Sequence, residues 1–236
     1  MSFKFSLKEI RNSFFIISII YFLVSAIEIL GDISGAKEVV YITKPLLMPL
    51  LILLYIPTWN QYRDNLSKLL IGALFFAFVG DVALMFVSSS EHYFLLGLGA
   101  FMITQILYVV VFSKAGGSFR MLSQPKWLFV LLVFGGIYFL LMNSLYDQLN
   151  EMKIPVLIYG AVVCLMGFTS TMRKPNQLSY YLVFIGACFF VASDSLIAIN
   201  KFLYSADLFL AQPSIMILYV LAQYFIVVGL IKAYKQ

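Results

Sequence analysis

Eight long apolar runs constrain the fold of this 236-residue chain more than any other feature of its sequence. Each run approaches the roughly 20 residues that a helix needs to cross the hydrocarbon core of a bilayer. The runs are continuously apolar and do not alternate with period two, so they favour helices over the strands of a β-barrel. Their approximate limits are 13–30, 39–57, 68–88, 92–113, 126–142, 154–172, 179–200 and 214–232.

Composition leaves no room for a separate soluble domain. Hydrophobic residues make up 62% of the chain and charged residues 11%, which is typical of an integral membrane protein. The longest breaks between runs are about a dozen residues, which is too short for a folded unit of their own. We therefore expect an all-α, polytopic transmembrane bundle of eight spans, forming a single transmembrane domain over residues 1–236.

Lysine and arginine indicate the orientation of the spans. If the N-terminus is cytoplasmic, the opposite side of the membrane holds only Lys37, Lys153 and Lys201. Cytoplasmic segments are enriched in positive charge, so this asymmetry predicts that both termini are cytoplasmic. The net charge of +5 then reflects topology, and no nucleic-acid partner is expected. The cytoplasmic charges are Lys4, Lys8, Arg11, Arg63, Lys68, Lys114, Arg120, Lys126, Arg173, Lys174, Lys232 and Lys235.

The first run follows Lys4, Lys8 and Arg11, as the apolar part of a signal peptide would. It is long, contains Glu28 and lacks a small-x-small cleavage site, so we interpret it as an uncleaved first span. We expect Glu28, near the outer end of this span, to reach water as an interfacial carboxylate, with ligand contact as the alternative. For a bacterial source the expected location is the plasma (inner) membrane.

Two aspartates lie in the middle of apolar spans. Asp81 occurs in GALFFAFVGDVALMF, residues 72–86, and Asp194 occurs in GACFFVASDSLIAIN, residues 186–200. A carboxylate at membrane depth is costly, so each should face the protein interior and have a partner. We expect the two acids to be each other's partner and to form the centre of a functional site.

The two halves of the chain show a faint internal repeat. GALFFAFVGD in the third span resembles GACFFVASD in the seventh, and ITQILYVVV in the fourth resembles LAQYFIVVG in the eighth. Four spans per half predict a parallel 4+4 repeat, with Asp81 and Asp194 facing each other across its interface. At about 1.5 Å per residue, these acids and Lys44 lie roughly 8 to 10 Å below the outer ends of their helices. This shared depth predicts a polar cavity in the non-cytoplasmic half of the membrane.

Lys44 lies just inside the second span, in the stretch TKPLLMPLLILLY. Its aliphatic stem could snorkel to the interface, or its ammonium could bind a phosphate or one of the acids. Pro45 and Pro49 follow it, and we expect them to bend or loosen this helix.

Further polar side chains in the spans could orient a ligand or bond a neighbouring helix. Gln105 and Tyr108 are three residues apart, and Tyr219 and Gln223 are four apart, so each pair shares one face of a helix.

The seventh span adds Ser193 and Asn200 to the candidates. The fifth and sixth spans have few polar residues, Tyr159 among them, so we interpret both spans as scaffold. His92 is the only histidine and lies at a span end, which argues against a histidine-based metal site or a Ser-His-Asp triad.

Several stretches together resemble the YhhN or TMEM86 family of lysoplasmalogenases, which have eight predicted spans. They are TKPLLMP around Lys44, VGDVAL around Asp81, GLGAFMITQILY around Tyr108, and GACFFVASDSLIAINKF followed by YVLAQYFIVV. Their order and spacing carry the resemblance through most of the chain. The family has histidine at the position of Gln105, and this departure argues against direct proton transfer by Gln105.

The resemblance implies an enzyme that cleaves the vinyl ether of a lysoplasmalogen, a lysophospholipid, to a fatty aldehyde and a glycerophospho-base. Asp81 and Asp194 would act as an acid/base pair, like the paired carboxyls of glycosidases. Asp81, with apolar neighbours, is the expected acid, and Asp194, beside Ser193 and Ser195, the expected ion. The substrate and membrane lipids are the expected partners, and no metal or cofactor is needed. The expected substrate-binding residues are Lys44, Gln105, Tyr108, Ser193, Asn200, Tyr219, Gln223 and Glu28.

Two other classes of protein are compatible with the sequence. A proton-coupled transporter of a small molecule or lipid could use Asp81 and Asp194 as a titrating relay, with Pro45 and Pro49 in a broken helix. A lipid-binding membrane module without turnover is the third possibility. The sequence does not predict an oligomeric state.

Overall fold

The computed structural model describes residues 7–115, 125–173, 176–205 and 210–234, and these residues form helices and short connections without any strand. Eight of the helices are long and apolar enough to cross a membrane, so the predicted all-α bundle of eight spans is confirmed. Two short 3-10 turns, Tyr146–Gln148 and Asn150–Met152, lie between α5 and α6. The eight helices are α1 (Leu7–Ser34), α2 (Lys37–Tyr62), α3 (Asn65–Met85), α4 (Glu91–Lys114), α5 (Pro125–Leu145), α6 (Lys153–Ser170), α7 (Gln177–Leu203) and α8 (Ala211–Ala233).

Several charges used in the topology prediction lie outside the described residues, namely Lys4, Arg120, Lys174 and Lys235. The orientation of the termini therefore stays a prediction. The 4+4 repeat likewise stays a prediction.

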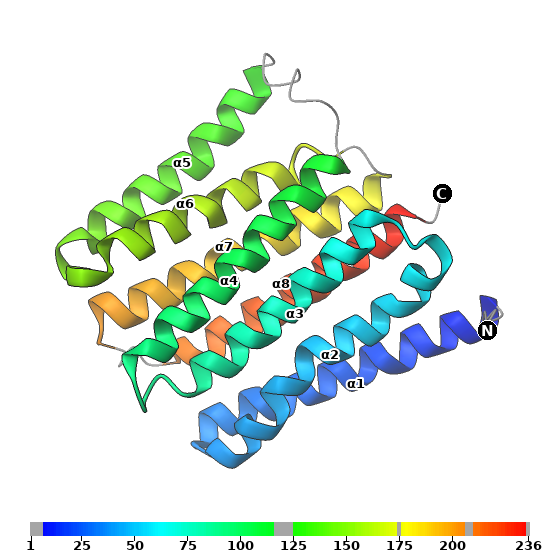
Figure 1. Ribbon diagram of the computed structural model, residues 1–236, viewed down its shortest axis with the longest axis horizontal. Helices are drawn as coiled ribbons and strands as arrows, with labels where there is room; N and C mark the ends of the chain where they lie inside the picture. The colour runs from blue at the N-terminus through cyan, green and yellow to red at the C-terminus, as the bar shows by residue number, and fades with distance from the viewer. Residues whose placement is uncertain (1–6, 116–124, 174–175, 206–209, 235–236) are drawn as a thin grey trace.

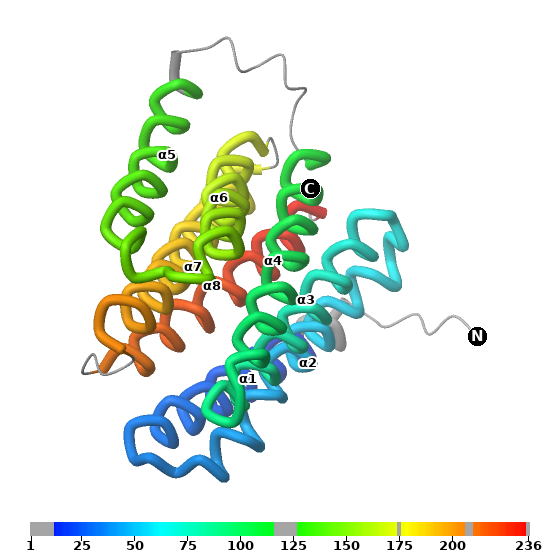
Figure 2. Tube along the Cα trace, turned by 60° about the vertical axis from the view of Figure 1, so that its left-hand side comes forward, coloured from blue at the N-terminus to red at the C-terminus, as the bar shows by residue number. Residues whose placement is uncertain are grey.

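The helices are arranged with α8 near the centre and the α1–α2 and α5–α6 pairs at opposite edges (Figure 1). Of the membrane-spanning window of α8, 67% is buried inside the protein, against 17% for α5. The same arrangement is visible after rotation, where α5 stands apart at one edge (Figure 2). Buried side chains from all eight helices nevertheless meet in one hydrophobic core.

Helices α7 and α8 approach each other closely because glycine lines their contact. A Cβ atom on Gly186 would lie 2.8 Å from the carbonyl oxygen of Ala222, and one on Gly229 would lie 2.6 Å from the Val183 side chain. Small residues allow such backbone approach in membrane helices. The contact brings the acid-bearing helix α7 against the central helix α8.

Helix α2 continues without interruption through Pro45, Pro49 and Pro57 and ends at Tyr62, beyond the predicted limit at residue 57. The prolines each remove one backbone donor, but the surrounding turns keep their hydrogen bonds and the chain stays helical. The polar residues after Pro57 end the apolar run without ending the helix, because backbone hydrogen bonds do not depend on side-chain hydropathy. The broken helix that the transporter alternative supposed at Pro45 and Pro49 is therefore not formed, and the expected bending stays a prediction.

Helix α3 begins and ends at well-defined residues. The Asp64 side chain caps its start by accepting from the backbone N–H of Ser67 at 2.7 Å. The helix ends at Met85, before the predicted limit at residue 88, with Phe86 as its C-cap. The apolar residues after Met85 lengthened the predicted span although their backbone forms a turn.

Candidate active site

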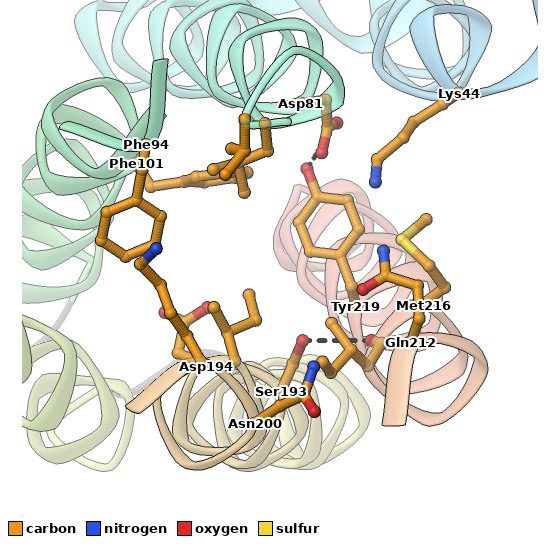
Figure 3. Close-up of a pocket in the computed structure, with 15 residues that line it drawn as sticks. Lys44, Asp81, Phe94, Phe101, Ser193, Asp194, Asn200, Gln212, Met216 and Tyr219 are labelled. Atoms are coloured by element: carbon orange, nitrogen blue, oxygen red, sulfur yellow. Dashed lines mark hydrogen bonds between the residues drawn. The ribbon is translucent and has the colours of Figure 1, made fainter. Parts of the chain in front are cut away.

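A cavity of about 200 Å³, here called the inner chamber, lies between α2, α3, α4, α7 and α8. Helices from both halves of the chain form its walls, and Asp81 and Asp194 project from opposite sides of it (Figure 3). The other lining residues are Lys44, Leu84, Val87, Phe94, Phe101, Ser193, Ile197, Asn200, Lys201, Gln212, Ile215, Met216 and Tyr219.

Asp81, on α3, is held by a chain of hydrogen bonds from α8 and α4. The Tyr219 hydroxyl donates to Asp81 Oδ2 at 2.8 Å. Gln223 Nε2 donates to that hydroxyl at 3.4 Å, and the Tyr108 hydroxyl donates to Gln223 Oε1 at 2.5 Å. Buried polar groups need such partners. Tyr108 and Gln223 therefore position Tyr219, and through it Asp81, from behind the chamber wall.

Asp194, on α7, is held by two donors from two other helices. The Tyr159 hydroxyl of α6 donates to Asp194 Oδ2 at 2.7 Å, and Gln105 Nε2 of α4 donates to the same atom at 3.4 Å. Gln105 is fully buried, and its Oε1 atom has no hydrogen-bond partner. Asp194 thus ties together three helices, while one amide oxygen beside it stays unsatisfied.

The two aspartates share the chamber, but their carboxyl groups are not hydrogen-bonded to each other. Each instead accepts from its own tyrosine, Tyr219 for Asp81 and Tyr159 for Asp194. The expectation that the acids are direct partners is therefore corrected. A tyrosine hydroxyl satisfies a buried carboxyl whether or not it is ionised, whereas two adjacent carboxylates repel each other.

Lys44 points into the inner chamber from α2 (Figure 3). Only 7% of its surface is exposed, so it does not snorkel along the outside of the bundle. Its ammonium interacts electrostatically with Asp81 and also with Glu28 and Asp32 on α1. Lys44 is therefore a cation of the chamber itself.

A wider chamber of about 590 Å³, here called the outer chamber, adjoins the inner one. The two share Lys44, Leu84, Asn200 and Gln212 as lining residues. The outer chamber lies where α1 and α2 are connected and α8 begins, and its wall contains charged and polar side chains. Its other lining residues are Gly31, Asp32, Gly35, Lys37, Val40, Tyr41, Met85, Ser88, Leu210, Ala211 and Pro213.

On the side of Asp194, a small apolar branch of about 40 Å³ continues between α4, α6 and α7. It shares Leu84, Phe94, Phe101, Asp194 and Ile197 with the inner chamber. Its remaining lining residues are Leu98, Val156, Tyr159, Ala198 and Phe202. The three spaces therefore run from a charged outer chamber to an apolar branch, with both acids between these extremes.

The other predicted site residues fall into two groups. Ser193, Asn200 and Tyr219 line the inner chamber, and the Ser193 hydroxyl donates to the Ile215 carbonyl at 3.1 Å. Gln105, Tyr108 and Gln223 are fully buried behind its walls and bond its residues or each other.

Glu28 differs from the expectation that it reaches water. It is fully buried, and neither carboxyl oxygen has a hydrogen-bond partner. The reason is that α1 continues to Ser34 and packs against α2 over this stretch. Being close to the end of an apolar run did not bring Glu28 to the end of its helix.

Three polar residues of the site were not singled out from the sequence, and one of them is Lys201, which lines the inner chamber from the end of α7. Tyr159, assigned to the scaffold, donates the shortest hydrogen bond to Asp194, and Gln212 lines both chambers from the start of α8. The available signal for Tyr159 was its hydroxyl in an apolar span, since a buried tyrosine hydroxyl usually finds a partner. Gln212 carried no comparable signal, because it lies at a helix start where polar residues are common.

Metal chemistry has no preformed centre in the described part of the chain. No group of three or more histidine, cysteine, aspartate or glutamate side chains is placed to hold an ion there. His92 is exposed at the start of α4. The titratable groups that face the inner chamber are the carboxyl groups of Asp81 and Asp194, the hydroxyl of Tyr219 and the ammonium groups of Lys44 and Lys201.

Comparison with known proteins finds a family whose sequence model covers the residues that line the inner chamber. The sequence model of the YhhN family matches residues 39–230, which is most of the chain and runs from near the start of α2 to near the end of α8. No curated protein and no solved structure is significantly similar to the chain. Helix α1, with Glu28 and Asp32, precedes the matched residues.

Proposed function

Because the chain belongs to the YhhN family, we propose that it is a membrane-embedded hydrolase of the vinyl ether bond in lysoplasmalogens. The observation that carries this proposal is the placement of two carboxyl groups on opposite walls of one chamber, Asp81 and Asp194. Vinyl ether hydrolysis needs a proton donor, a stabiliser of an oxocarbenium ion and an activated water. Two carboxyl groups with different surroundings can supply all three.

The cavity changes from charged at the outer chamber to apolar at the branch, and this change suits an amphiphile with one chain. The first carbons of the alkenyl chain would lie in the apolar branch beside Asp194, and the rest of the chain would continue between helices toward the membrane. The glycerophospho group would lie toward the outer chamber and Lys44. The vinyl ether, between chain and glycerol, then falls in the inner chamber between the acids. A single-chain lipid would reach this position sideways between helices, from the membrane.

In the first step, the acid gives its proton to the alkenyl carbon that is not bonded to oxygen. The carbon–carbon double bond supplies the electron pair, and the adjacent carbon becomes part of an oxocarbenium ion. We assign the proton to Asp81, which accepts one hydrogen bond, from Tyr219. Phosphate binding to Lys44 would neutralise the nearby positive charge and so favour the protonated form of Asp81 in the complex.

In the second step, Asp194 stabilises the oxocarbenium ion and takes a proton from the attacking water. Its two donors, Tyr159 and Gln105, suit a carboxylate that is to stay ionised. The hemiacetal that forms then breaks its bond to the glycerol oxygen, which takes the proton from Asp194, while the hemiacetal hydroxyl gives its proton back to Asp81 and becomes the carbonyl of the aldehyde. The products are a fatty aldehyde and a glycerophospho-base, and one water has been consumed.

Gln105 does not transfer a proton in this scheme, because an amide neither accepts nor releases a proton near neutral pH. It donates to Asp194 and so orients the carboxylate. The proton that leaves the attacking water therefore resides on Asp194 until the glycerol oxygen takes it up.

The test is aldehyde release by purified protein in detergent. A lysoplasmalogen would be compared with its lyso-ester counterpart, using the parent, Asp81→Asn and Asp194→Asn. Asp147→Asn is the matched control, because Asp147 is an exposed acid away from the chamber. Aldehyde from the parent and the control alone supports the proposal. Equal release by all four proteins, or none by the parent, contradicts the two-acid hydrolase.

The same proteins separate the hydrolase from a transporter. Sealed liposomes containing the parent would be given a pH gradient and a labelled lysophospholipid, and uptake would be followed over time. Gradient-driven uptake that requires Asp81 and Asp194, without aldehyde release, would instead favour a proton-coupled carrier.

A further inference from the structure

The hydrogen bonds behind Asp81 form a chain that runs in one direction. The Tyr108 hydroxyl on α4 donates to Gln223 Oε1 on α8, and Gln223 Nε2 donates to the Tyr219 hydroxyl. The Tyr219 hydroxyl in turn donates to Asp81 Oδ2, as the dashed line in Figure 3 marks. Every hydrogen in the chain therefore points from α4 toward the carboxyl group.

Tyr108 is the fixed end of this chain. Its side chain is fully buried, and the bond to Gln223 is the one hydrogen bond that its hydroxyl makes in the described part of the protein. The ring is held in place because it stacks on Phe112 and meets Phe190 edge-on. A buried donor without an acceptor is costly. The Tyr108 hydroxyl must therefore face an acceptor, and the Gln223 amide has only one, its oxygen.

The amide of Gln223 can take two orientations, in which its oxygen and nitrogen exchange places. In the orientation observed, the oxygen accepts from Tyr108 and the nitrogen faces Tyr219. In the reverse orientation, the oxygen would face the Tyr219 hydroxyl and compete with Asp81 for its hydrogen. Gln223 is fully buried, so water cannot compensate for the exchange. The orientation of this amide thus decides which group receives the hydrogen of Tyr219.

Tyr219 has a single hydroxyl hydrogen and can donate it to one acceptor at a time. Asp81 Oδ2 lies 2.8 Å from the hydroxyl and the Met48 sulfur lies 3.6 Å from it, and a thioether is the weaker acceptor. Because Oδ2 accepts from Tyr219, the proton of the acid form of Asp81 lies on Oδ1, outside the chain. In a reversed chain, Asp81 would donate this proton to Tyr219 and withhold it from a substrate.

We propose that Tyr108 is a positioning residue for the proton of Asp81. By donating to Gln223 it fixes the direction of the chain, and so it keeps the acid proton on Oδ1, where it can be transferred. The proposal rests on the proposed function for the role of Asp81 as the acid, and it adds the residue that orients the proton. Tyr108 acts through Gln223 and Tyr219 and touches no substrate.

This role predicts a particular order of effects. Tyr108→Phe frees the Gln223 amide to reverse, so that Tyr219 donates to the amide oxygen and Asp81 loses its donor. Gln223→Leu removes the competing oxygen, so Tyr219 keeps Asp81 as its acceptor. Loss of the distant hydroxyl should therefore do more harm than loss of the residue next to Tyr219. Tyr108→Phe should also lose most of its effect when Gln223→Leu is already present.

The first test is a double-variant cycle on single-turnover aldehyde release. We expect Tyr108→Phe to lower the rate about tenfold, because Asp81 loses one hydrogen bond, and Gln223→Leu to lower it about threefold or less. The double variant should match Gln223→Leu. The control is Tyr224→Phe, which removes a hydroxyl that donates to Ser18 on α1 and takes no part in the chain; its rate should equal that of the parent. Thermal unfolding shows that each variant keeps its fold.

The second test does not depend on hydrolysis. Infrared spectra of acidified protein in detergent show the carbonyl stretch of protonated carboxyl groups, and subtraction of the Asp81→Asn spectrum isolates that of Asp81. In the parent, the Asp81 carbonyl oxygen accepts from Tyr219, which lowers the stretching frequency. Tyr108→Phe should raise this frequency toward the value in Tyr219→Phe, whereas Gln223→Leu should leave it near the value in the parent.

An Asp81 carbonyl frequency that does not change in Tyr108→Phe overturns the positioning role. Rate losses of Tyr108→Phe and Gln223→Leu that multiply in the double variant overturn it as well. If the frequency shifts as expected but no protein releases aldehyde, the direction of the chain stands and the hydrolase falls. If aldehyde is released and the frequency does not shift, the hydrolase stands and the positioning role falls.

Discussion

Asp81 and Asp194 occupy similar apolar runs, but the protein surrounds them differently. Asp81 is 2% exposed, accepts one hydrogen bond from Tyr219 and lies near the Lys44 ammonium. Asp194 accepts hydrogen bonds from two side chains and borders the apolar branch. The charged end of the cavity therefore adjoins Asp81, and the apolar end adjoins Asp194. Two carboxyl groups that look alike in the sequence are given unlike surroundings by the fold, and the proposed mechanism assigns them different tasks for that reason.

Removing either acid should break this division of labour and have the largest effect. We expect Asp81→Asn and Asp194→Asn each to lower kcat by about 10² to 10⁴, the usual contribution of a general acid or base. Because the two groups act on one reaction, the double variant should be little worse than either single variant. Single-turnover aldehyde release measures this, and fully additive losses would show that the acids act independently.

Removing the tyrosine donors should separate the two acids. Tyr219→Phe takes the one hydrogen bond from Asp81, whereas Tyr159→Phe leaves Asp194 with Gln105 as donor. We expect Tyr219→Phe to lower kcat about tenfold, because Asp81 loses the hydrogen bond that orients it and a typical hydrogen bond contributes about 0.5–1.5 kcal/mol. Tyr159→Phe should cost somewhat less, because Gln105 still donates to Asp194. The comparison of kcat with KM is the readout. A larger loss for Tyr159→Phe would reverse the assigned order.

Filling the apolar branch should affect only substrate binding on the Asp194 side of the cavity. Ala198 lines this branch, and Ala198→Phe would occupy space that the proposed chain needs. We expect KM for a long-chain substrate to rise about tenfold, through lost apolar burial, with little change for a short-chain substrate. A chain-length series measures the effect, with Ala198→Gly as the control. An equal change for all chain lengths would place the chain elsewhere.

Replacing Asp64, which is hydrogen-bonded to Ser67 and Tyr234 at the start of α3 and distant from both acids, should lower stability and leave activity unchanged. Partial burial opposes ionisation of Asp64, but hydrogen bonds from the Tyr234 hydroxyl and from Ser67 outweigh it and lower the pKa of the carboxyl. A lowered pKa stabilises the fold above the pKa of the unfolded chain, and this stability is lost as pH falls through the folded pKa.

Asp64→Ala should cost about 1 kcal/mol of unfolding free energy, the usual value for a lost N-cap. The cost should be largest near neutral pH and shrink in acid, where the parent loses the same contribution. Thermal unfolding in detergent at several pH values measures this, and aldehyde release serves as the control. A change in kcat would show that this end of the bundle communicates with the chamber.

The sequence predicted the fold more completely than it predicted the site. Hydropathy located all eight helices, but helix ends such as Tyr62 and Met85 differed from the predicted limits because backbone turns, and not side-chain polarity, end a helix. Asp81, Asp194 and Lys44 were singled out by the cost of placing charge in an apolar run. Tyr159 was passed over because a hydroxyl in a membrane span carries little cost until its partner is known.

By itself, the sequence determined that this is a membrane bundle, because the length and apolarity of each run are local properties that no tertiary contact can change. It also singled out Asp81 and Asp194 as charged groups that should face the interior. Only the tertiary structure decided which polar groups meet. Spacing along a helix shows that Tyr219 and Gln223 share a face, but the direction of that face depends on the rotation of α8 within the bundle. That rotation is set by packing against several helices at once, and it placed Tyr219 on Asp81. In the same way, the packing of α6 and α7 placed Tyr159 on Asp194, and the packing of α1 against α2 put Glu28 out of reach of water.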